Sequence, residues 1–419
     1  MIQLALAIAW LLVLPLAAVA AYRAVFFVAY LLRAGRGRAN APPARYRRFA
    51  IVVPAHDEEL LIGELIASIR AVDYPAGQLD IHVIADNCSD RTAERARSLG
   101  AQVAERFDLE QRGKGQALSW MFARLDLQGV DAVTIFDADN LVEPGFFRAM
   151  NAALEAGARC AQGYYGIANP GESTLTRLLA VTYVMKNLLY NGGKAALGLS
   201  VSLMGTGMVF AREVIEGAGW SSFTIGEDLE QSLALLERGE EIRFVSDARI
   251  RAQESTTLRQ GYTQRQRWAT GRRALRRRAW ALVGSGLRQG SLHRIDAGLD
   301  LLVPSYSKLL YLSGLAFLAT LPLAPFAPAL LAVTSAVVLY QLAEVGVALR
   351  IMRAGRRVLV SLAFAPVFLV WKALIDALAL VGYRRQVWAR TERQPHTDAA
   401  PAAGYSEPAP IGDPPRSSR

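Results

Sequence analysis

The apolar residues of this chain gather at its two ends, and this placement constrains the fold more than any other feature. The apolar stretches cover residues 2–32, 302–320, 327–349 and 358–381. Each is close to or longer than the roughly 20 residues that a helix needs to cross a bilayer. The middle of the chain has a mixed composition, although 52% of all residues are hydrophobic. We therefore expect a water-soluble domain held to a membrane by helices on both sides, rather than one oversized core.

Changes in composition along the chain predict its domain organisation. The expected segments are an N-terminal transmembrane helix at 1–33, a basic linker at 34–48, an α/β domain at 49–271, an amphipathic interface segment at 272–300, about three transmembrane helices within 301–383, and a disordered tail at 384–419. The tail is rich in Pro, Ala and Ser, a composition that does not support a packed core. The two cysteines, Cys88 and Cys160, have no metal-type spacing and imply no disulfide framework.

The formal net charge of +10 comes largely from arginines that flank the apolar stretches. These flanks contain Arg33, Arg36, Arg38, Arg45, Arg47 and Arg48, and then Arg272, Arg273, Arg276, Arg277 and Arg278. Such residues favour the cytoplasmic side of a membrane, close to anionic lipid. We expect a multi-pass protein of the cell inner membrane whose middle domain is cytoplasmic. No nucleic-acid-binding motif accompanies the charge, so we expect no nucleic acid partner.

The C-terminal end presents a conflict in topology. If the middle domain is cytoplasmic, a fourth span sends the C-terminus outside. The residues that follow the last apolar stretch nevertheless include Arg384, Arg385, Arg390 and Arg393, and positive residues favour the inside. We expect four spans, and the alternative is that one apolar stretch is re-entrant or lies in the membrane interface.

The middle domain alternates between patterns typical of strands and of helices. The expected strands are 49–54, 79–85, 101–105 and 132–136, and the helices between them are 58–70, 89–100 and 115–125. Such alternation predicts an α/β fold with a mainly parallel sheet. Asp57, Asp86 and Asp137 each lie just beyond the end of an expected strand. Ligands of parallel sheets bind at that edge, so we expect these residues to share a ligand site.

Carboxylates and a lysine supply the candidate chemistry at this edge. Asp137 and Asp139, two residues apart after a strand, can hold Mg²⁺ or Mn²⁺ against a diphosphate. Lys114 lies between two glycines that let a backbone approach a phosphate, although this segment could also be a surface turn. Asp86 is placed to accept hydrogen bonds from a nucleotide base, although it could instead cap the helix expected at 89–100.

The order of three motifs carries a resemblance to a known family. Asp137-Ala138-Asp139 is followed by Glu227-Asp228 and then by Gln264, Arg267 and Trp268 in the pattern Q-x-x-R-W. From about residue 50 to residue 271, this order resembles the membrane-integrated, inverting family 2 glycosyltransferases. That group includes the cellulose, chitin and hyaluronan synthases and the ceramide glucosyltransferases. The resemblance implies a GT-A, Rossmann-like cytosolic domain between N- and C-terminal transmembrane helices.

The resemblance also implies roles for individual residues. Asp228 would be the catalytic base, with Glu227 orienting the site. Nucleotide donor binding would involve Ala55, Glu58, Asp86, Lys114 and Asp137, and the metal would be held by Asp139 and Asp137. Acceptor and diphosphate contacts would come from Gln264, Arg267, Trp268 and Gly205. Without the upstream acids, the segment with Trp268 would instead be typical of a helix anchored at a membrane surface.

The implied reaction joins a sugar from a nucleotide sugar, a UDP-sugar by resemblance, to an acceptor through a β-linkage. We expect a growing polysaccharide as the acceptor. The alternative is the transfer of one sugar to a membrane lipid, as the ceramide glucosyltransferases do with similar motifs. A catalytically silent membrane scaffold is a third hypothesis, and the intact motifs oppose it.

Overall fold

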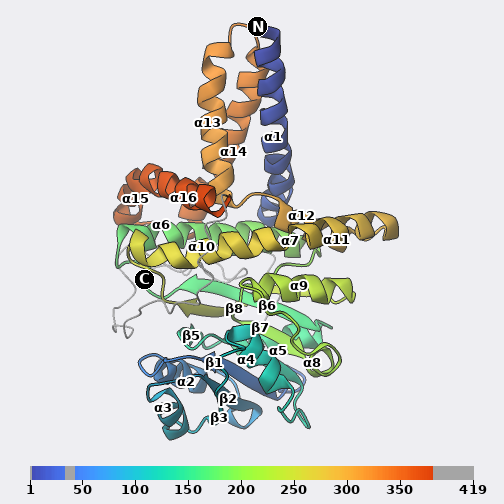
Figure 1. Cartoon of the computed structure of the whole chain (residues 1–419), viewed down its shortest axis with the longest axis vertical. Helices are drawn as coiled ribbons and strands as arrows, with labels where there is room; N and C mark the ends of the chain where they lie inside the picture. Colours follow the sequence, from blue (N-terminus) through green and yellow to red (C-terminus); the bar gives the residue numbers. More distant parts are fainter. Residues whose placement is uncertain (1, 34–42, 381–419) are drawn as a thin grey trace, which may run out of the picture.

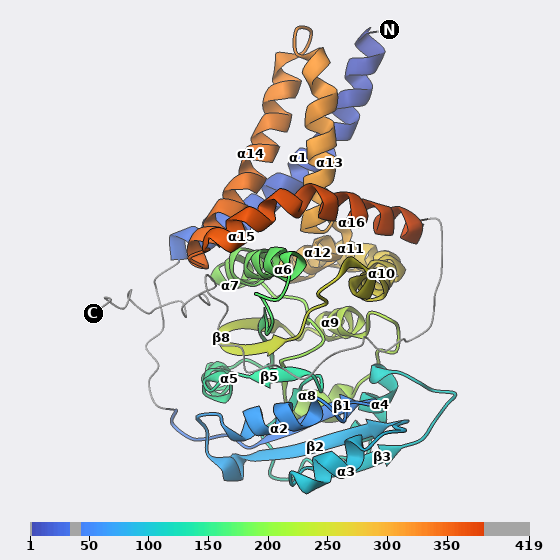
Figure 2. The same ribbon diagram turned by 90° about the vertical axis from the view of Figure 1, so that its left-hand side faces the viewer.

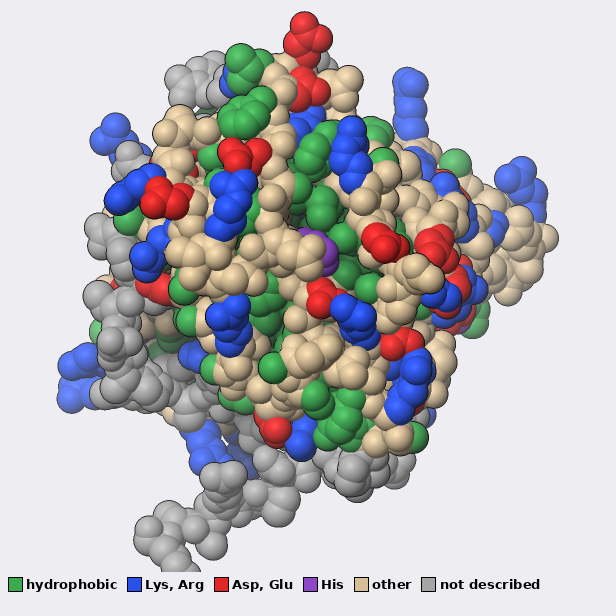
Figure 3. All heavy atoms as spheres, turned by 90° about the horizontal axis from the view of Figure 1, so that it is seen from below, with side chains coloured by type: hydrophobic (Ala, Val, Ile, Leu, Met, Phe, Trp, Pro, Cys, Tyr) green, Lys and Arg blue, Asp and Glu red, His purple; other side chains and the backbone are tan. Residues whose placement is uncertain are grey.

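The computed structural model describes residues 2–33 and 43–380 and places an α/β domain beneath a group of long helices (Figure 1). The end of the domain remote from these helices carries positive and negative side chains interspersed over its surface (Figure 3). Such a surface is typical of contact with water. The disordered tail predicted at 384–419 and most of the predicted linker lie outside the described residues.

The described residues form one eight-stranded sheet with the order β3-β2-β1-β4-β7-β6-β8-β5. The first half is parallel, as predicted, and contains β1 (Phe49–Ala55), β2 (Leu79–Asp86), β3 (Gln102–Arg106) and β4 (Ala132–Ile135). The second half contains β5 (Asn140–Val142), β6 (Cys160–Ile167), β7 (Met208–Ala211) and β8 (Ile242–Ala252). Strand β7 runs antiparallel to both β4 and β6, so the sheet is mixed.

Helices cover both faces of this sheet, which explains why β1 is an almost continuous apolar run. Alternate residues of β1 enter different cores: Ile51 packs among α2 (Ile62–Arg70) and α5 (Phe146–Glu155), and Val52 packs among α4 (Lys114–Phe122) and α6 (Thr174–Val184). The remaining helices of the domain are α3 (Thr92–Ser98), a π-helical segment η2 (Met185–Gly192), α7 (Gly193–Ala196), α8 (Arg212–Ala218) and α9 (Glu227–Glu237). The predicted α/β class is confirmed.

Three long apolar helices pack side by side and point away from the α/β domain (Figures 1 and 2). They are α1 (Ile2–Arg33), α13 (Tyr306–Thr320) and α14 (Pro328–Ile351). The N-terminal end of α1 lies far from the domain, and α13 and α14 form a hairpin whose tip lies at the same level (Figure 1). Each is long and apolar enough to cross a membrane, as predicted, with the short turn Leu321–Leu323 included in the α13 candidate.

The fourth apolar stretch has a different direction. It forms α15 (Arg356–Ser361), a short turn (Leu362–Phe364) and α16 (Ala365–Leu380), which together we call the crosswise helix. Its length and composition also qualify it as a candidate span. It nevertheless lies across the base of the three-helix bundle and contacts α6, α10 (Leu258–Ala274) and α13 (Figure 2). Its direction therefore differs from that of the other three candidate spans, and this direction agrees with the interfacial alternative.

The segment predicted to be amphipathic forms α11 (Arg276–Gln289) and α12 (Leu292–Leu302). Buried charges connect α12 to the rest of the molecule. The ammonium group of Lys194 in α7 lies 2.8 Å from the Asp296 carboxylate, and the hydroxyl of Tyr22 in α1 donates to the same carboxylate at 2.7 Å. Breaking a buried ion pair by removing one partner costs about 3–5 kcal/mol. These contacts therefore fix α12 between α1 and the α/β domain.

Candidate functional site

A pocket of about 350 Å³ lies at the carboxyl ends of β1, β2 and β4, with α10 as its opposite wall. All but one of the candidate site residues named from the sequence line this pocket: Ala55, Glu58, Asp86, Lys114, Asp137, Asp139, Gly205, Glu227, Asp228, Gln264, Arg267 and Trp268. The exception is Asp57, which was expected to share the ligand site and does not line the pocket. The lining residues are spread over more than 200 positions of the chain. The fold thus brings together the groups that the motif order predicts to be neighbours.

Asp86 occupies the end of the pocket formed by β1 and β2. Its carboxylate accepts a hydrogen bond from Arg106 at 2.6 Å, and both side chains are buried. Burial raises the pKa of Asp86, and the pairing with Arg106 offsets this only in part. Asp86 does not cap α3, which begins after Arg91; the carboxylate that accepts from the Thr92 N–H, at 2.9 Å, is that of Asp90. Asp86 remains available to line the pocket.

Asp57 joins the loops that follow β1 and β2. It has a left-handed backbone with φ of 54°, and its carboxylate accepts hydrogen bonds from the N–H groups of Ser89 and Asp90. Asp57, Cys88 and Asp90 also place potential metal-ligand atoms within 4.8 Å of one another. The carboxylates of this group already accept backbone N–H bonds, and sulfur is a soft ligand that Mg²⁺ and Mn²⁺ disfavour. The group therefore serves the structure of these loops.

Lys114, the first residue of α4, lies at the centre of the pocket. Its ammonium group donates to the carboxylate of Asp137 and to the carbonyl of Gly205, both at 2.5 Å. Glu227 is 4.0 Å away. Burial alone would lower the pKa of Lys114, but the carboxylates of Asp137 and Glu227 more than offset this and raise it. Lys114 therefore stays positively charged beside a group of acids.

Asp137 and Asp139 supply the oxygen ligands that the expected cation requires. The turn after β4 is fixed because the Asp137 N–H donates to the Thr206 hydroxyl at 3.1 Å. Asn140 donates to the carboxylate of Asp139 at 3.1 Å, and Asp139 is only 2% exposed. Both carboxylates face the same pocket. Two carboxylates supply the hard oxygen ligands that Mg²⁺ and Mn²⁺ prefer, and phosphate and water would fill the remaining coordination positions of the cation.

Glu227 and Asp228 begin α9 on the side of the pocket facing Gly205. Burial, reinforced by the charge of Asp228, raises the pKa of Glu227 to about 7. Burial also raises the pKa of Asp228, against the opposing effects of the Leu229 N–H and Lys114. Gly205 has φ of 85°, and a β-carbon there would lie 3.7 Å from the Asp228 carboxylate. Glycine thus permits the turn and leaves space in front of Asp228.

Helix α10 presents Gln264, Arg267 and Trp268 to the pocket, and Trp268 is 43% exposed. A close contact between two glycines sets the distance of this helix from α9. A β-carbon on Gly271 would lie 3.0 Å from the backbone nitrogen of Gly226, so a larger residue there would force the two elements apart. The acids of α9 and the side chains of α10 can therefore approach the same ligand.

An ion pair between Arg265 of α10 and Glu254 also holds this helix in position. The guanidinium group of Arg265 pairs with the buried Glu254 carboxylate at 3.5 Å and lies 5.4 Å from the centre of the Trp268 ring. Tyr183 donates its hydroxyl proton to the same carboxylate. These contacts hold the Arg265 guanidinium group beside the Trp268 ring.

The pocket also contains residues that the sequence reasoning did not identify. Tyr165 and Met204 line it, and so do Phe223, Thr224 and Ile225 from the loop before α9. Most are apolar and belong to no motif. Met204 and residues 223–225 are close in the chain to Gly205 or to Glu227, whereas Tyr165 has no such sequence signal. Tyr165 packs edge-to-face against Tyr183 with ring centres 5.2 Å apart.

Comparison with known proteins agrees with this arrangement. The family described as "Glycosyltransferase like family 2" matches residues 45–271, over half of the chain. The probable glycosyltransferase YdaM of Bacillus subtilis (strain 168) is 27% identical over 237 residues, which are 54% of this chain and 55% of that protein. The β-monoglucosyldiacylglycerol synthase of Synechocystis sp. is 27% identical over 246 residues, 55% of this chain and 49% of that protein. The chain thus spans about half the length of these curated relatives.

Among solved structures, the mannosyltransferase PcManGT from Pyrobaculum calidifontis, in complex with GDP-Man and Mn²⁺, is similar to this chain. The two are 20% identical, with a TM-score of 0.49 over 86% of this chain and 99% of that one.

Proposed function

The chain belongs to glycosyltransferase family 2, and we propose that it transfers one sugar from a UDP-sugar to a membrane lipid, with inversion to a β-linkage. The family makes it a transferase that uses a nucleotide sugar. The sugar carrier, the acceptor and the roles of individual residues belong to the proposal.

The observation that carries the proposal is the position of Asp228. It is a partly buried carboxylate with a raised pKa, it lies in front of Gly205, and α10 faces it across the pocket. A general base works best when its pKa is close to the operating pH. Asp228 would take the proton of the acceptor hydroxyl while that oxygen forms a bond to C1 of the sugar. The bond from C1 to the diphosphate oxygen breaks in the same step, and UDP leaves with the electron pair.

The remaining groups would position the donor. Asp86 would accept hydrogen bonds from the base or ribose, and Arg267 would pair with the diphosphate through its planar guanidinium group. Lys114 would hold Asp137 and Glu227 in place and add positive charge beside the leaving group. Asp137 and Asp139 would hold Mg²⁺ or Mn²⁺, which neutralises the charge of the departing diphosphate when bound.

Two observations favour a lipid acceptor over a growing polymer. Helix α10, which carries Trp268 and the other acceptor-side residues, packs directly against the crosswise helix: Gly261 of α10 lies beside the Trp371 ring of α16. The acceptor side of the pocket is therefore next to the helix at the base of the bundle. In addition, three relatives that are 27–28% identical over about half of this chain are named as β-monoglucosyldiacylglycerol synthases, whereas a cellulose synthase catalytic subunit that also matches is 24% identical.

The membrane topology belongs to the same proposal. Helices α1, α13 and α14 would cross the inner membrane, and the crosswise helix would lie in the interface on the cytoplasmic side with the catalytic domain. After α14 the chain would then be cytoplasmic. Positive residues favour the inside of the membrane, and this topology places the arginines after residue 381 there. Four spans would place them outside.

Mass spectrometry of the products tests the proposed acceptor. The purified chain would be placed in lipid nanodiscs containing diacylglycerol and offered a panel of UDP-sugars. The expected product is a lipid heavier by one sugar, and Asp228→Asn serves as the matched inactive control. A ladder of oligosaccharides, free or attached to lipid, would instead support the polysaccharide synthase that the motif order also allows. If neither product appears with any nucleotide sugar, the proposed transfer is wrong.

A further inference from the structure

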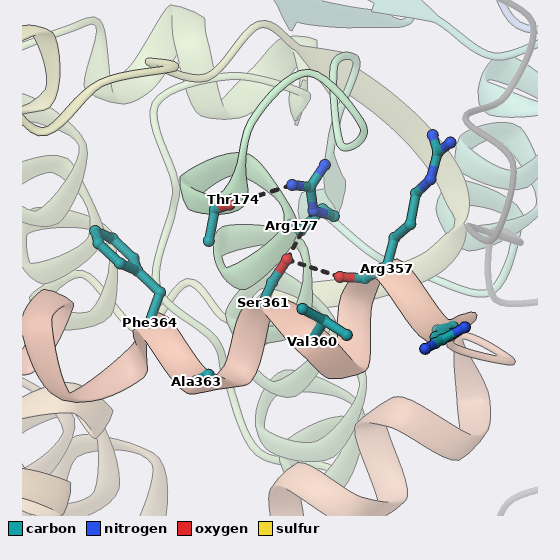
Figure 4. Close-up of a pocket in the computed structure, with 8 residues that line it drawn as sticks. Thr174, Arg177, Arg357, Val360, Ser361, Ala363 and Phe364 are labelled. Atoms are coloured by element: carbon teal, nitrogen blue, oxygen red, sulfur yellow. Dashed lines mark hydrogen bonds between the residues drawn. The ribbon is translucent and has the colours of Figure 1, made fainter.

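A second pocket, of about 1040 Å³, lies between the start of α6 and the start of the crosswise helix (Figure 4). Its charged side chains are Arg177 from α6 and Arg356 and Arg357 from α15. Val360 and Phe364 supply an apolar part of its lining. It shares no lining residue with the pocket that contains Asp228. We infer that this second pocket binds the phosphate headgroup of an anionic phospholipid from the cytoplasmic leaflet.

The arginines have positive charge that no described carboxylate balances. Within residues 2–33 and 43–380, no ion pair involves Arg177, Arg356 or Arg357. Arg177 is held by neutral groups: it donates to the Ser361 hydroxyl at 2.7 Å, to the Gly171 carbonyl at 2.9 Å and to the Thr174 hydroxyl at 3.2 Å. A guanidinium group fixed in this way is preorganised for a phosphate, which it binds in a planar, paired geometry.

The crosswise helix places these arginines at the level of lipid headgroups. Exposed apolar residues follow one another at helical spacing along one side of it: Val360, Val367, Val370, Leu374 and Leu378. Val360 is 65% exposed and Val370 is 63% exposed. A helix with such a stripe, lying across the base of a transmembrane bundle, is typical of the boundary between headgroups and acyl chains. The arginines at its start then face the headgroup layer.

The mixed lining distinguishes a lipid from free phosphate. A phosphate ion would use only the guanidinium groups, whereas a phospholipid also places its glycerol and upper acyl chains against Val360 and Phe364. The bound lipid would connect α6 of the catalytic domain to α15 of the crosswise helix. Because α16 contacts α10, this lipid would also hold the acceptor side of the catalytic pocket at the membrane surface.

Native mass spectrometry of the full chain in neutral detergent tests the site. Dihexanoyl phosphatidylglycerol is the probe, and dihexanoyl phosphatidylcholine and inorganic phosphate are the comparison ligands. The test variant is Arg356→Gln/Arg357→Gln, since both residues are exposed and their loss should not prevent folding. The matched control is Arg350→Gln/Arg353→Gln, which removes the same charge from nearby exposed positions that do not line the pocket.

We expect the wild type and the control to retain phosphatidylglycerol with similar affinity. The test variant should bind roughly 25-fold more weakly, because each basic residue near an anionic surface contributes about fivefold (about 1 kcal/mol). Equal loss in both variants would overturn the proposal, since binding would then follow the overall surface charge. So would equal binding of phosphatidylcholine, or displacement of the lipid by an equal concentration of phosphate. The measurement uses no sugar donor, so its outcome is independent of the proposed glycosyl transfer.

Discussion

Asp228 and Asp139 occupy the same pocket, but the proposed mechanism gives them separable roles. Asp228→Asn keeps the size and hydrogen bonding of the side chain but removes the base. We expect near-native UDP affinity and a loss of transfer of roughly 10²–10⁴-fold, as is typical of a missing general base. Asp139→Asn should instead weaken UDP binding in the presence of Mn²⁺, because a ligand of the cation is lost. Calorimetric titration with UDP and a rate measurement on each variant check this division.

Near-normal turnover in Asp228→Asn would rule out Asp228 as the base. The next candidate would be Glu227, whose carboxylate lies in the same buried group.

Glu227 should determine part of the pH dependence. Its ordinary pKa of 4.5 is raised to about 7 by burial and by the charge of Asp228, so most molecules hold a neutral Glu227 at pH 6. As the pH falls through 7, Glu227 takes up a proton, and Lys114 loses one of the negative charges beside it. We expect the rate to fall on this acid side. In Glu227→Gln this proton equilibrium is absent, and the acid limb of kcat/KM should move to lower pH, even if the maximal rate is reduced. An acid limb at the same pH in both proteins would contradict the assignment.

At the scale of elements, the distance between α9 and α10 depends on Gly226 and Gly271. A β-carbon at Gly271 would lie 3.0 Å from the Gly226 nitrogen, and backbone atoms cannot turn away as a side chain can. Gly271→Ala should therefore move α10 away from Asp228 and lower the transfer rate several-fold, at a cost in stability of about 1–3 kcal/mol from overpacking. Rate and thermal unfolding measurements would detect both effects.

Gly284→Ala is the matched control. It is also a glycine-to-alanine change within a helix, but nothing lies within 4 Å of its added β-carbon. This variant should keep the wild-type rate and be slightly more stable, because alanine favours helices by roughly 1 kcal/mol over glycine. Equal rates in the two variants would show that the glycine contact does not set the geometry of the pocket.

The parallel half of the sheet was predictable because each strand carries its own local signal. Phe49–Ala55 is a short apolar run, and Leu79–Asp86 begins with alternating apolar and polar residues; polar turn residues follow each strand, and a helical pattern separates them. The other half, in which β7 and β5 run antiparallel to their neighbours, has no such signal. Met208–Ala211 pairs with both β4 and β6 through contacts between residues that are distant in the chain. Local pattern alone does not specify such pairing.

The residues that line the candidate pocket were predictable from the motifs, whereas the contacts that hold these residues in place were not. Asp137, Asp228 and Gln264 belong to recognisable motifs, and the fold brings them to one pocket. Glu254 and Arg265 support Trp268 through a tertiary contact across about ten positions, and neither was singled out from the sequence.

The direction of the crosswise helix could not be predicted from the sequence alone, although the arginines after it left an interfacial stretch open. Its apolar length equals that of a span, and only its packing on α10 and α13 distinguishes it.

At the scale of the whole molecule, three spans and four spans predict different positions for the C-terminal end. A reporter fused after residue 380 should give a cytoplasmic signal, as should one inserted near Gly100 in the catalytic domain. In the proposed topology, α1, α13 and α14 cross the membrane and return the chain to the domain side, whereas the crosswise helix, which lies across the base of the bundle, does not cross (Figure 2). An extracytoplasmic signal from the C-terminal fusion, with a cytoplasmic signal near Gly100, would establish four spans. Alkaline phosphatase and green fluorescent protein fusions provide the two readouts.

In the proposed mechanism, one partly buried base, Asp228, drives a single displacement at C1 of the sugar. The anomeric configuration of the product tests this most directly. The purified chain would be incubated in nanodiscs with diacylglycerol and a UDP-sugar carrying an α-linkage and a ¹³C label at C1, and the extracted lipid would be examined by NMR. The proposed mechanism predicts a β-linked sugar, since attack opposite the leaving group inverts C1. An α-linked product would require retention at C1, and it would contradict the single-displacement role of Asp228.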